Sequence, residues 1–374
     1  MNPSSPAGDI VFEQASLLCY RLHDIADEVD LEAAGRLISG GLRPLKLTRE
    51  GSQYIELPRP PIAFHVGKRQ LGLAGGEVEV ELEVRLFDFG AASVQVSIPI
   101  PPGTGLEALT QLADSVYDGP AVDALCAEVV ETVRTRVGPA LRGAHRTGTV
   151  EGYTIVFTQS LRGIDAAPEL LERVDLARLL LGEPASVRLS TAEREAVTSC
   201  HFSYTDQDLV VVDWNAAFVW EPSGSRDIPL LLELVNAQLL ELRYYDALLE
   251  ARLDETYTDM ERKRRGLLLI RSPYQRLTRR TLATVLELQE FIERAENSIK
   301  VIGDVYLAKV YEAAAQQLRL PSWQNSVTRK QELLARTYDL LKGEVDTDRA
   351  LLLEATIVLL IVFEIVMAFL KVMS

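Results

Sequence analysis

A nearly uninterrupted apolar segment closes the chain, and it restricts the possible folds more than any other feature. Within LLLEATIVLLIVFEIVMAFLKVMS, the stretch from Leu351 to Leu370 has fourteen Leu, Ile, Val or Phe residues and neither Pro nor Gly. One bilayer-spanning helix needs roughly 20 such residues. Their summed preference for lipid, roughly 0.3–0.6 kcal/mol each, exceeds the roughly 3 kcal/mol cost of one central acidic residue. The alternative, a core helix, would need protein on every side. The pattern therefore predicts a single transmembrane helix over residues 349–371.

Two glutamates interrupt this segment, Glu364 near its middle and Glu354 near one edge. Because they are ten residues apart, they differ by roughly 80° around a helix and share one broad side. An intramembrane carboxyl normally faces a partner helix or a wet cavity, and a single span has to find that partner in another chain. We therefore expect Glu354, Glu364 and Lys371 to lie at the membrane and oligomer interface of a homo-oligomer.

The two ends of the sequence predict where the protein works. The first residues, MNPSSPAGDIVFEQ, have neither the pattern of a secretion signal nor the Arg-rich composition of a transit peptide. With the apolar segment at the other end, we expect a tail-anchored, single-pass protein of the cell (inner or plasma) membrane whose bulk is cytoplasmic. The cysteines Cys19, Cys126 and Cys200 are widely spaced and suit a reducing compartment.

The charge of the chain bears on its partners. A formal net charge of -15 repels polyanions at long range. DNA is therefore not expected as a partner. The expected partners are the lipid bilayer and further copies of the same chain.

Residues 1–225 mix strand and helix patterns. In GEVEVELEVRLFDFG, the apolar residues from Val78 to Val84 alternate with charged ones, which is typical of a strand with one solvated face. Further strands are expected at AASVQVSIPI, SCHFSYT, DLVVVDW and AAFVWEP, with an earlier hairpin around REGSQ. Amphipathic helices are expected over residues 105–116, 121–141 and 168–181. These patterns predict an α+β domain.

Beyond residue 225 the apolar period becomes that of long helices. Two apolar seams step by three and four residues, over residues 231–252 and 285–306. The second seam breaks at RLPSW, where we expect Pro321 to end one helix and Ser322 to cap the next. Residues 226–348 are therefore predicted to form an antiparallel helical bundle or a coiled-coil stalk. The seams can be filled within one chain or by a neighbouring chain.

Two elements of the sequence resemble the "required for meiotic nuclear division" family. One is FDFGA at residues 87–91, followed much later by Trp323 after a proline. The more specific one is RALLLEATIVLLIVFEIV, whose Arg349, Leu353-Glu354 and Glu364-Ile365 match the family's tail. The resemblance implies a homo-oligomeric, membrane-anchored prokaryotic member with an α+β domain, a helical stalk and a C-terminal span. By analogy it also implies a link to translation, with a membrane-associated protein or a ribosomal partner, and it brings no catalytic residue.

Motifs that would indicate an enzyme are absent from the sequence. It contains no GxxxxGK[ST], HExxH or GxSxG pattern, and its glycine cluster GLAGGEVEV precedes a strand, where a turn is expected. The histidines His23, His65, His145 and His201 lack metal-ligand spacing, so structural or surface roles are expected for them. We predict no catalytic residue, no cofactor and no metal site.

One basic region, ERKRRGLLLIRSPYQRLTRR, stands out on this acidic chain. Its charges either pair with acidic helices or coat a solvated turn. The other interpretation is that they dock anionic lipid headgroups or ribosomal RNA. The candidate docking residues are Arg262, Lys263, Arg264, Arg265, Arg271, Arg276, Arg279 and Arg280.

Taken together, these patterns predict a non-enzymatic, membrane-anchored, homo-oligomeric scaffold or interaction protein at the cytoplasmic face of the membrane. One alternative is an enzyme in the α+β domain that uses acidic residues such as Asp88, Asp206, Asp208 and Asp213. Asp206 and Asp208 fall at an expected hairpin tip, where turn chemistry is the more common role. A further alternative is a subunit of an oligomeric channel or transporter whose spans enclose a water path past Glu364.

Overall fold

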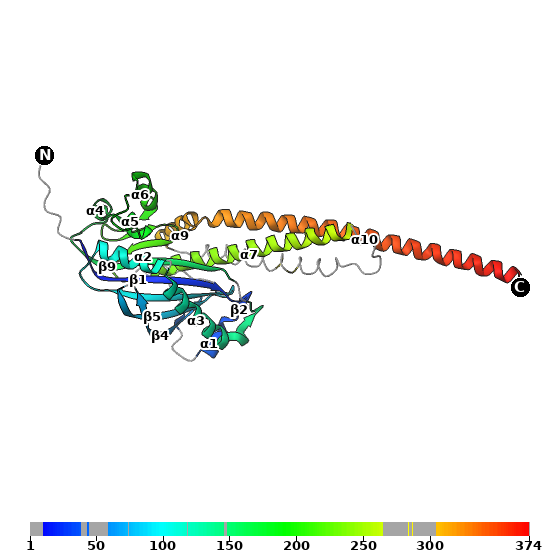
Figure 1. The fold of residues 1–374 in the computed structure, drawn as a ribbon, viewed down its shortest axis with the longest axis horizontal. Helices are drawn as coiled ribbons and strands as arrows, with labels where there is room; N and C mark the ends of the chain where they lie inside the picture. Colours follow the sequence, from blue (N-terminus) through cyan, green and yellow to red (C-terminus); the bar gives the residue numbers. More distant parts are fainter. Residues whose placement is uncertain are drawn as a thin grey trace. The chain divides into compact units, whose positions relative to one another are not determined.

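The computed structural model describes residues 10–38, 43–44, 59–73, 75–117, 119–145, 148–264, 283, 286 and 304–373. The chain is α+β, with an N-terminal sheet domain and C-terminal helices, which confirms the predicted class (Figure 1). It divides into two compact units. The first contains Met1–Tyr244 and Arg294–Trp323, and the second contains Tyr245–Glu293 and Gln324–Ser374.

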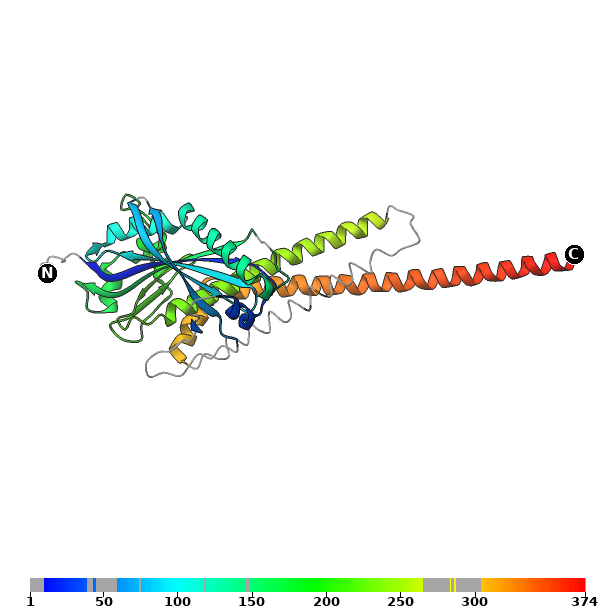
Figure 2. The ribbon, with the colours of Figure 1, turned by 90° about the horizontal axis from the view of Figure 1, so that it is seen from below.

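The first unit is built on a strongly twisted sheet, which Figure 2 shows. Its strands run in the order β10-β11-β12-β9-β1-β6-β5-β4-β3, and β7 pairs with β1. A separate small sheet pairs β2 with β8. The strands are β1 Val11–Asp24, β2 Glu28–Val29, β3 Arg43–Pro44, β4 Ile62–Leu73, β5 Gly76–Leu86, β6 Ala91–Ile100, β7 Thr104–Gly105, β8 Leu141–Arg142, β9 Val150–Arg162, β10 His201–Phe202, β11 Leu209–Val212 and β12 Ala216–Trp220.

Strand β1 is the centre of this sheet. Its Leu17 lies opposite Ile98 of β6 and opposite Val156 of β9, both in antiparallel register. Strand β12 joins the other side of β9 in parallel, so the chain crosses over between β9 and β12. The crossover contains α4 Ala167–Arg173, α5 Leu176–Leu181 and α6 Thr191–Thr198.

The remaining helices belong to one or both of the two units. They are α1 Leu31–Leu37, α2 Leu106–Tyr117, α3 Pro120–Val137, the short 3-10 turn η1 Gly138–Ala140, α7 Asp227–Arg264, α9 Val305–Gln317 and α10 Leu320–Met373. The predicted helix over 168–181 is broken into α4 and α5, because Asp175 caps a new helix with its side chain.

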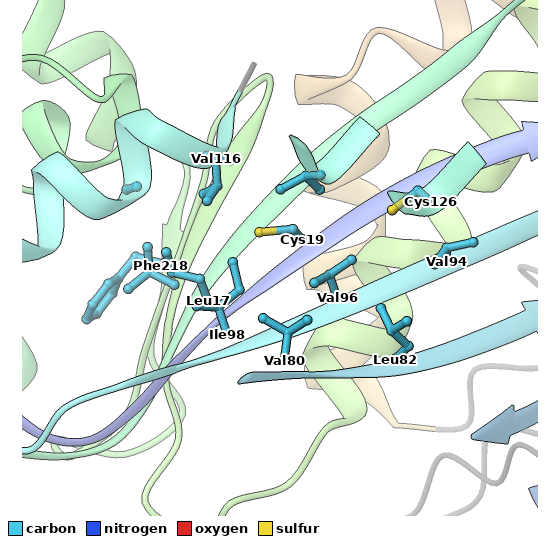
Figure 3. Close-up of a cluster of buried hydrophobic side chains, with 14 of the residues drawn as sticks. Leu17, Cys19, Val80, Leu82, Val94, Val96, Ile98, Val116, Cys126 and Phe218 are labelled. Carbon is cyan, nitrogen blue, oxygen red and sulfur yellow. The ribbon is translucent and has the colours of Figure 1, made fainter. Parts of the chain in front are cut away.

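One face of the sheet carries the main hydrophobic core. Leu17 and Cys19 of β1 alternate onto this face, as do Val80 and Leu82 of β5, and Figure 3 shows them beside Val116 and Cys126 of α2 and α3. Successive residues of a strand point to opposite faces, so this packing fixes which residues face the other way.

The opposite face is covered by the first part of α7. Arg85 of β5 forms an ion pair with Glu233 of α7, and Glu151 of β9 forms one with Arg243 of α7. The side chain of Glu81 is 58% exposed, whereas that of Arg85 is only 8% exposed. The face of β5 that was expected to be solvated is therefore open at one end of the strand and buried beneath α7 at the other.

The connection from α9 to α10 differs from the predicted one. Helix α9 ends at Gln317, and Arg319 takes a left-handed φ of 54° before α10 starts at Leu320. Pro321 therefore lies in the first turn of α10, where its missing N–H removes no helical hydrogen bond. The prediction that Pro321 ends a helix and that Ser322 caps the next was wrong, because the break comes two residues earlier.

In the second unit, α7 and α10 contact each other through polar groups. Ser326 donates to Asp246 at 2.7 Å, and the Lys330 ammonium lies 3.0 Å from Asp246 and 2.9 Å from Glu250. Ser326 meets Asp246, and Lys330, four residues later, meets Glu250, also four residues later. The two helices therefore run parallel, as both views show (Figures 1 and 2). Leu249, a position of the first predicted seam, is fully buried.

Two predicted elements lie outside the described residues. The second seam over residues 285–302, apart from residue 286, is among them, and so is the hairpin around REGSQ. The antiparallel pairing predicted for the helical region stays a prediction.

Candidate functional site: an exposed apolar helix and a charged pocket

The terminal part of α10 presents apolar side chains on every side. All fifteen residues from Leu353 to Met367 are exposed. Eleven of them are large hydrophobic residues with exposed fractions between 50% and 71%: Leu353, Ile357, Val358, Leu359, Leu360, Ile361, Val362, Phe363, Ile365, Val366 and Met367. A run of consecutive exposed residues covers the full circumference of a helix. So large an apolar surface marks an interaction site.

The predicted interface glutamates lie on this apolar segment. Glu354 and Glu364 are both exposed, and Lys371 belongs to α10 with a side chain that is not described. Among the described residues, none of the helices combines the length and the apolarity needed to cross a bilayer.

The basic region is described only at its start. Arg262, Lys263 and Arg264 form the last turn of α7, and their side chains are not described. The other five candidate docking residues lie outside the described residues: Arg265, Arg271, Arg276, Arg279 and Arg280.

A charged pocket opens where the face of β4, β5 and β6 meets the start of α7. Its volume is about 160 Å³. This is about half of the roughly 300 Å³ at which sites for drug-sized ligands begin, so the pocket suits a small molecule. The lining residues are Tyr20, His65, Glu81, Glu83, Arg85, Gln95, Ser97, Arg226, Pro229 and Leu230.

The inner wall of the pocket is an ion-pair network centred on Arg85. Its guanidinium donates to Glu233 at 2.5 Å and to Glu83, and it reaches Gln95 at 3.4 Å. Glu233 is 1% exposed, and burial raises the pKa of its carboxyl, while the charge of Arg85 counteracts the rise. Two carboxylates thus surround a single guanidinium, so the network has one more acidic group than basic ones.

Two further hydrogen-bond donors line the pocket, the hydroxyl of Tyr20 and the guanidinium of Arg226. The Tyr20 hydroxyl is buried and makes no hydrogen bond within the described part of the chain. Burial and the charge of Glu233 raise the pKa of this phenol, so the hydroxyl keeps its proton. The Arg226 guanidinium stacks 4.0 Å from the centroid of the Phe157 ring. Arg226 is exposed, and the negative charge of Glu83 acts on its guanidinium.

A second polar cluster surrounds His145. Its Nε2 lies 2.8 Å from Oδ2 of Asp24, its Nδ1 lies 3.3 Å from Asp27, and its ring stacks on Tyr244 at 5.0 Å. Burial lowers the pKa of His145, but the hydrogen bonds to Asp24 and Asp27 outweigh it and raise the pKa to about 10. The imidazolium is therefore charged at neutral pH and unsuited to act as a base. Among the described residues no His, Cys, Asp or Glu group has the arrangement of a metal site.

Beside this cluster, Glu241 of α7 is 1% exposed. Burial, reinforced by the charges of Asp24 and Asp27, raises the pKa of its carboxyl well above the usual range. Its Oε1 has no hydrogen-bond partner among the described atoms. Glu241 therefore favours its protonated form in the folded protein.

The acidic residues considered as catalytic groups lie in three different turns, and only Asp206 and Asp208 share one. Asp208 accepts hydrogen bonds from the backbone N–H groups of Tyr204, at 2.9 Å, and Thr205. The carboxyl of Asp213 accepts from Gln317 at 3.2 Å. The backbone carbonyl of Asp88 accepts from Val29 in the turn after β5.

The FDFG turn, one basis of the resemblance, has a structural role. Gly90 has a φ of 107°, and a Cβ at this position would lie 1.7 Å from the carbonyl oxygen of Ala26. Its own carbonyl accepts from the N–H of Ile25 at 3.1 Å. The turn therefore holds the segment that carries Asp24 and Asp27.

Sequence reasoning missed the pocket residues Tyr20 and Arg226 and the pairing of Asp24 with His145. Within β1 the apolar run around Tyr20 gave no sign of which residue faces a cavity. One signal was available in the sequence. Arg85 follows Glu79, Glu81 and Glu83 on the same face of β5, and this change from acidic to basic residues indicates that the surroundings of that face change there.

Comparison with known proteins supports an uncharacterised family. Residues 14–226, more than half of the chain, match the family model described as "Uncharacterized protein MJ0711, N-terminal domain". The uncharacterised protein MJ0711 of Methanocaldococcus jannaschii is 24% identical over 171 residues, 45% of this chain and 51% of that protein. The chain thus spans about half the length of this curated relative. No solved structure matches the chain.

These findings do not support the resemblance to the "required for meiotic nuclear division" family. The match covers the sheet domain, whereas the resemblance rested mainly on the tail beyond residue 348. An apolar helix with spaced glutamates is a pattern that any helix in an apolar environment can converge on, so it identifies a family weakly.

Proposed function

The chain belongs to the family of the MJ0711 N-terminal domain, and on that premise we propose that it is a non-enzymatic, membrane-anchored, homo-oligomeric scaffold. The main observation that supports this proposal is the run of fifteen exposed residues from Leu353 to Met367. Water disfavours such a surface by roughly 25 cal/mol per Å² of apolar area. Hydrocarbon removes this cost on all sides of the helix at once. The proposed bilayer segment extends over residues 349–371.

Assembly in the membrane follows from the two glutamates on this segment. A carboxyl inside hydrocarbon costs about 3 kcal/mol unless a partner group or water meets it. Glu354 and Glu364 share one side of the helix, so a second copy of α10 can cover both. We propose that the bulk of the chain works at the cytoplasmic face, where the oligomer organises its partners.

Two further roles expected from the sequence, lipid docking by the basic region and a link to translation, have less support. Docking of anionic lipid by the basic region stays a proposal, since most of that region lies outside the described residues. The link to translation gains no support from the family to which the chain belongs.

Alkaline carbonate extraction of cell membranes tests the anchor, because it releases peripheral proteins and leaves integral ones in the pellet. The full chain is expected in the pellet. The double variant Leu359→Arg/Phe363→Arg places two charges in the segment, at roughly 5–7 kcal/mol in total, and is expected in the supernatant.

The matched control is Val305→Arg/Leu333→Arg, which adds the same charge at two exposed apolar residues outside the segment. This control is expected to stay in the pellet. Release of the unaltered chain by carbonate would refute the anchor. Chemical crosslinking in the same membranes is expected to give a ladder of oligomers that Glu364→Leu alters, whereas a strict monomer would refute the assembly.

A further inference from the structure

One side of the apolar part of α10 differs from the rest of the helix. Its residues are spaced alternately by four and by three, and all of them are exposed: Ala350, Glu354, Ile357, Ile361 and Glu364. At roughly 100° for each residue, these five lie within roughly 40° of a single line along the helix. The opposite side has only large apolar residues in the same stretch, among them Leu359, Phe363 and Val366. The first set is named the glutamate stripe.

We propose that the glutamate stripe is the contact between copies of this chain, which pack in parallel with Glu364 of one copy facing Glu364 of the next. This inference rests on the proposed membrane anchor. It extends that proposal by naming the surface, the orientation and the register of the assembly.

The orientation and the register follow from the anchor. Each copy has one proposed bilayer segment, over residues 349–371, and every copy enters the membrane from the same side. Helices inserted in this way run parallel to one another. The apolar segment has the same length in every copy, so all copies match the hydrocarbon layer at the same depth. Identical residues of neighbouring copies therefore meet at the same level of the bilayer.

The two carboxyls decide what covers the stripe. A carboxyl in hydrocarbon needs a polar partner or water, and lipid chains supply neither. A parallel copy brings a second carboxyl to the level of both Glu354 and Glu364. Two adjacent carboxylates repel each other strongly at low dielectric constant, so such a pair keeps at least one proton and forms a hydrogen bond across the contact. The stripe is thus complementary to the same stripe on another copy.

The glutamate stripe also faces away from α7. In the part of α10 that contacts α7, Val327 and Leu334 are fully buried, and Lys330 forms ion pairs with α7. Counted at roughly 100° for each residue, these positions lie on the opposite side of α10 from the stripe. Asn325 and Glu332 are in line with the stripe, and both are exposed. Among the described residues, α7 therefore does not block the approach of a second copy.

Cysteine crosslinking of the full chain in cell membranes tests the surface, the orientation and the register together. A disulfide forms only when two Cβ atoms approach to about 4 Å, so a single introduced cysteine detects copies that place identical residues face to face. The background variant is Cys200→Ser, because Cys200 is partly exposed whereas Cys19 and Cys126 are buried.

Two positions in the stripe are compared with two on the opposite side. Ile357→Cys and Ile361→Cys are expected to form disulfide-linked dimers at least about tenfold faster than Leu359→Cys and Val366→Cys. All four are large apolar residues of one segment, with exposed fractions between 50% and 71%. They differ mainly in the side of the helix on which they lie, so the two outer positions are matched controls.

Substitution of Glu364 tests the hydrogen bond. Association is measured by energy transfer between fluorescently tagged full-length copies in vesicles, as added lipid dilutes them. Glu364→Leu removes the carboxyl and is expected to weaken association roughly 3–30-fold, the range for one polar contact between membrane helices. Glu364→Gln keeps the capacity to form a hydrogen bond and is expected to associate nearly as well as the unaltered chain. Phe363→Leu, on the opposite side at the same depth, is the control and is expected to change nothing.

Carbonate extraction of the same variants separates failure of this contact from failure of the anchor. Equal crosslinking rates at all four cysteines, or faster crosslinking at Leu359 and Val366, would refute the stripe while the variants stay in the pellet. The hydrogen bond is wrong if Glu364→Leu associates as tightly as the unaltered chain. Release of the unaltered chain by carbonate would refute the anchor, and with it the contact that rests on it.

Discussion

Nε2 of His145 lies 2.8 Å from Oδ2 of Asp24, which is 121 residues earlier in the chain. The pair joins the end of β1 to the loop after β8, and Asp27 approaches the other nitrogen of the same ring. The imidazole is thereby charged in the folded protein, and the contacts that hold it depend on that charge.

The stability of the fold should therefore depend on pH through His145. Its folded pKa of about 10 lies above the unfolded value of 6.5, so its contribution is complete below pH 6.5 and is lost as pH rises towards 10. His145→Gln is expected to lower the free energy of unfolding by about 2 kcal/mol at pH 6, and by much less near pH 10. Urea titrations followed by tryptophan fluorescence measure this difference. His201→Gln, at an exposed histidine, is the control, and a loss that does not vary with pH would contradict the assignment.

Replacement of Glu241 by glutamine should stabilise the protein at neutral and alkaline pH. The raised pKa means that the folded state retains a proton which the unfolded chain releases above about pH 4.5. The stability of the unaltered protein therefore falls as pH rises, by up to about 1.4 kcal/mol per unit relative to Glu241→Gln. Unfolding titrations between pH 5 and 8 should show the two proteins diverging. Glu312→Gln, at an exposed glutamate of α9, should show no such divergence.

Gly90 should tolerate no side chain. Gly90→Ala places a methyl group against the carbonyl of Ala26 and forces alanine into a φ of 107°. We expect a loss of about 3 kcal/mol or more, measured by thermal unfolding. Gly75→Ala is the control, because a Cβ at Gly75 meets nothing within 4 Å. Equal stability of the two variants would disprove the role given to the FDFG turn.

The ion pair between Arg85 and Glu233 should be costly to break from one side alone. Arg85→Leu leaves Glu233 buried without its cation, and an uncompensated buried charge costs about 3–5 kcal/mol. Arg85→Leu/Glu233→Leu removes both charges and is expected to recover most of that loss. Urea unfolding of the single and double variants measures the coupling. Additive losses would mean that the two groups do not interact.

An element of this fold could be predicted from the sequence where burial on one side leaves a regular pattern in neighbouring residues. Strand β5 was predicted because one of its faces is apolar and the other is charged. Strand β1 gave no such alternation, since Leu17, Leu18, Cys19 and Tyr20 are all buried, on two different faces. The break at Arg319 was missed because Pro321, two residues later, carries the stronger local signal.

The candidate sites also differ in whether a local sequence pattern predicts them. The apolar end of α10 is a local pattern and can be read directly from the sequence. The contact between Asp24 and His145 and the pocket formed by Tyr20, Arg85 and Arg226 join distant segments. No local signal predicts such contacts, because they depend on the order of the strands in the sheet.

That strand order has a consequence for synthesis on the ribosome. Leu17 pairs with Ile98 and with Val156, so β1 is made first but receives its two neighbours about 80 and about 140 residues later. Until β9 has left the exit tunnel, one edge of an apolar strand stays open to pairing with other nascent chains. The second face of the sheet stays bare still longer, until α7 emerges. We therefore expect the newborn chain to need a chaperone over this interval, and a pause in translation before residue 150 to increase its aggregation.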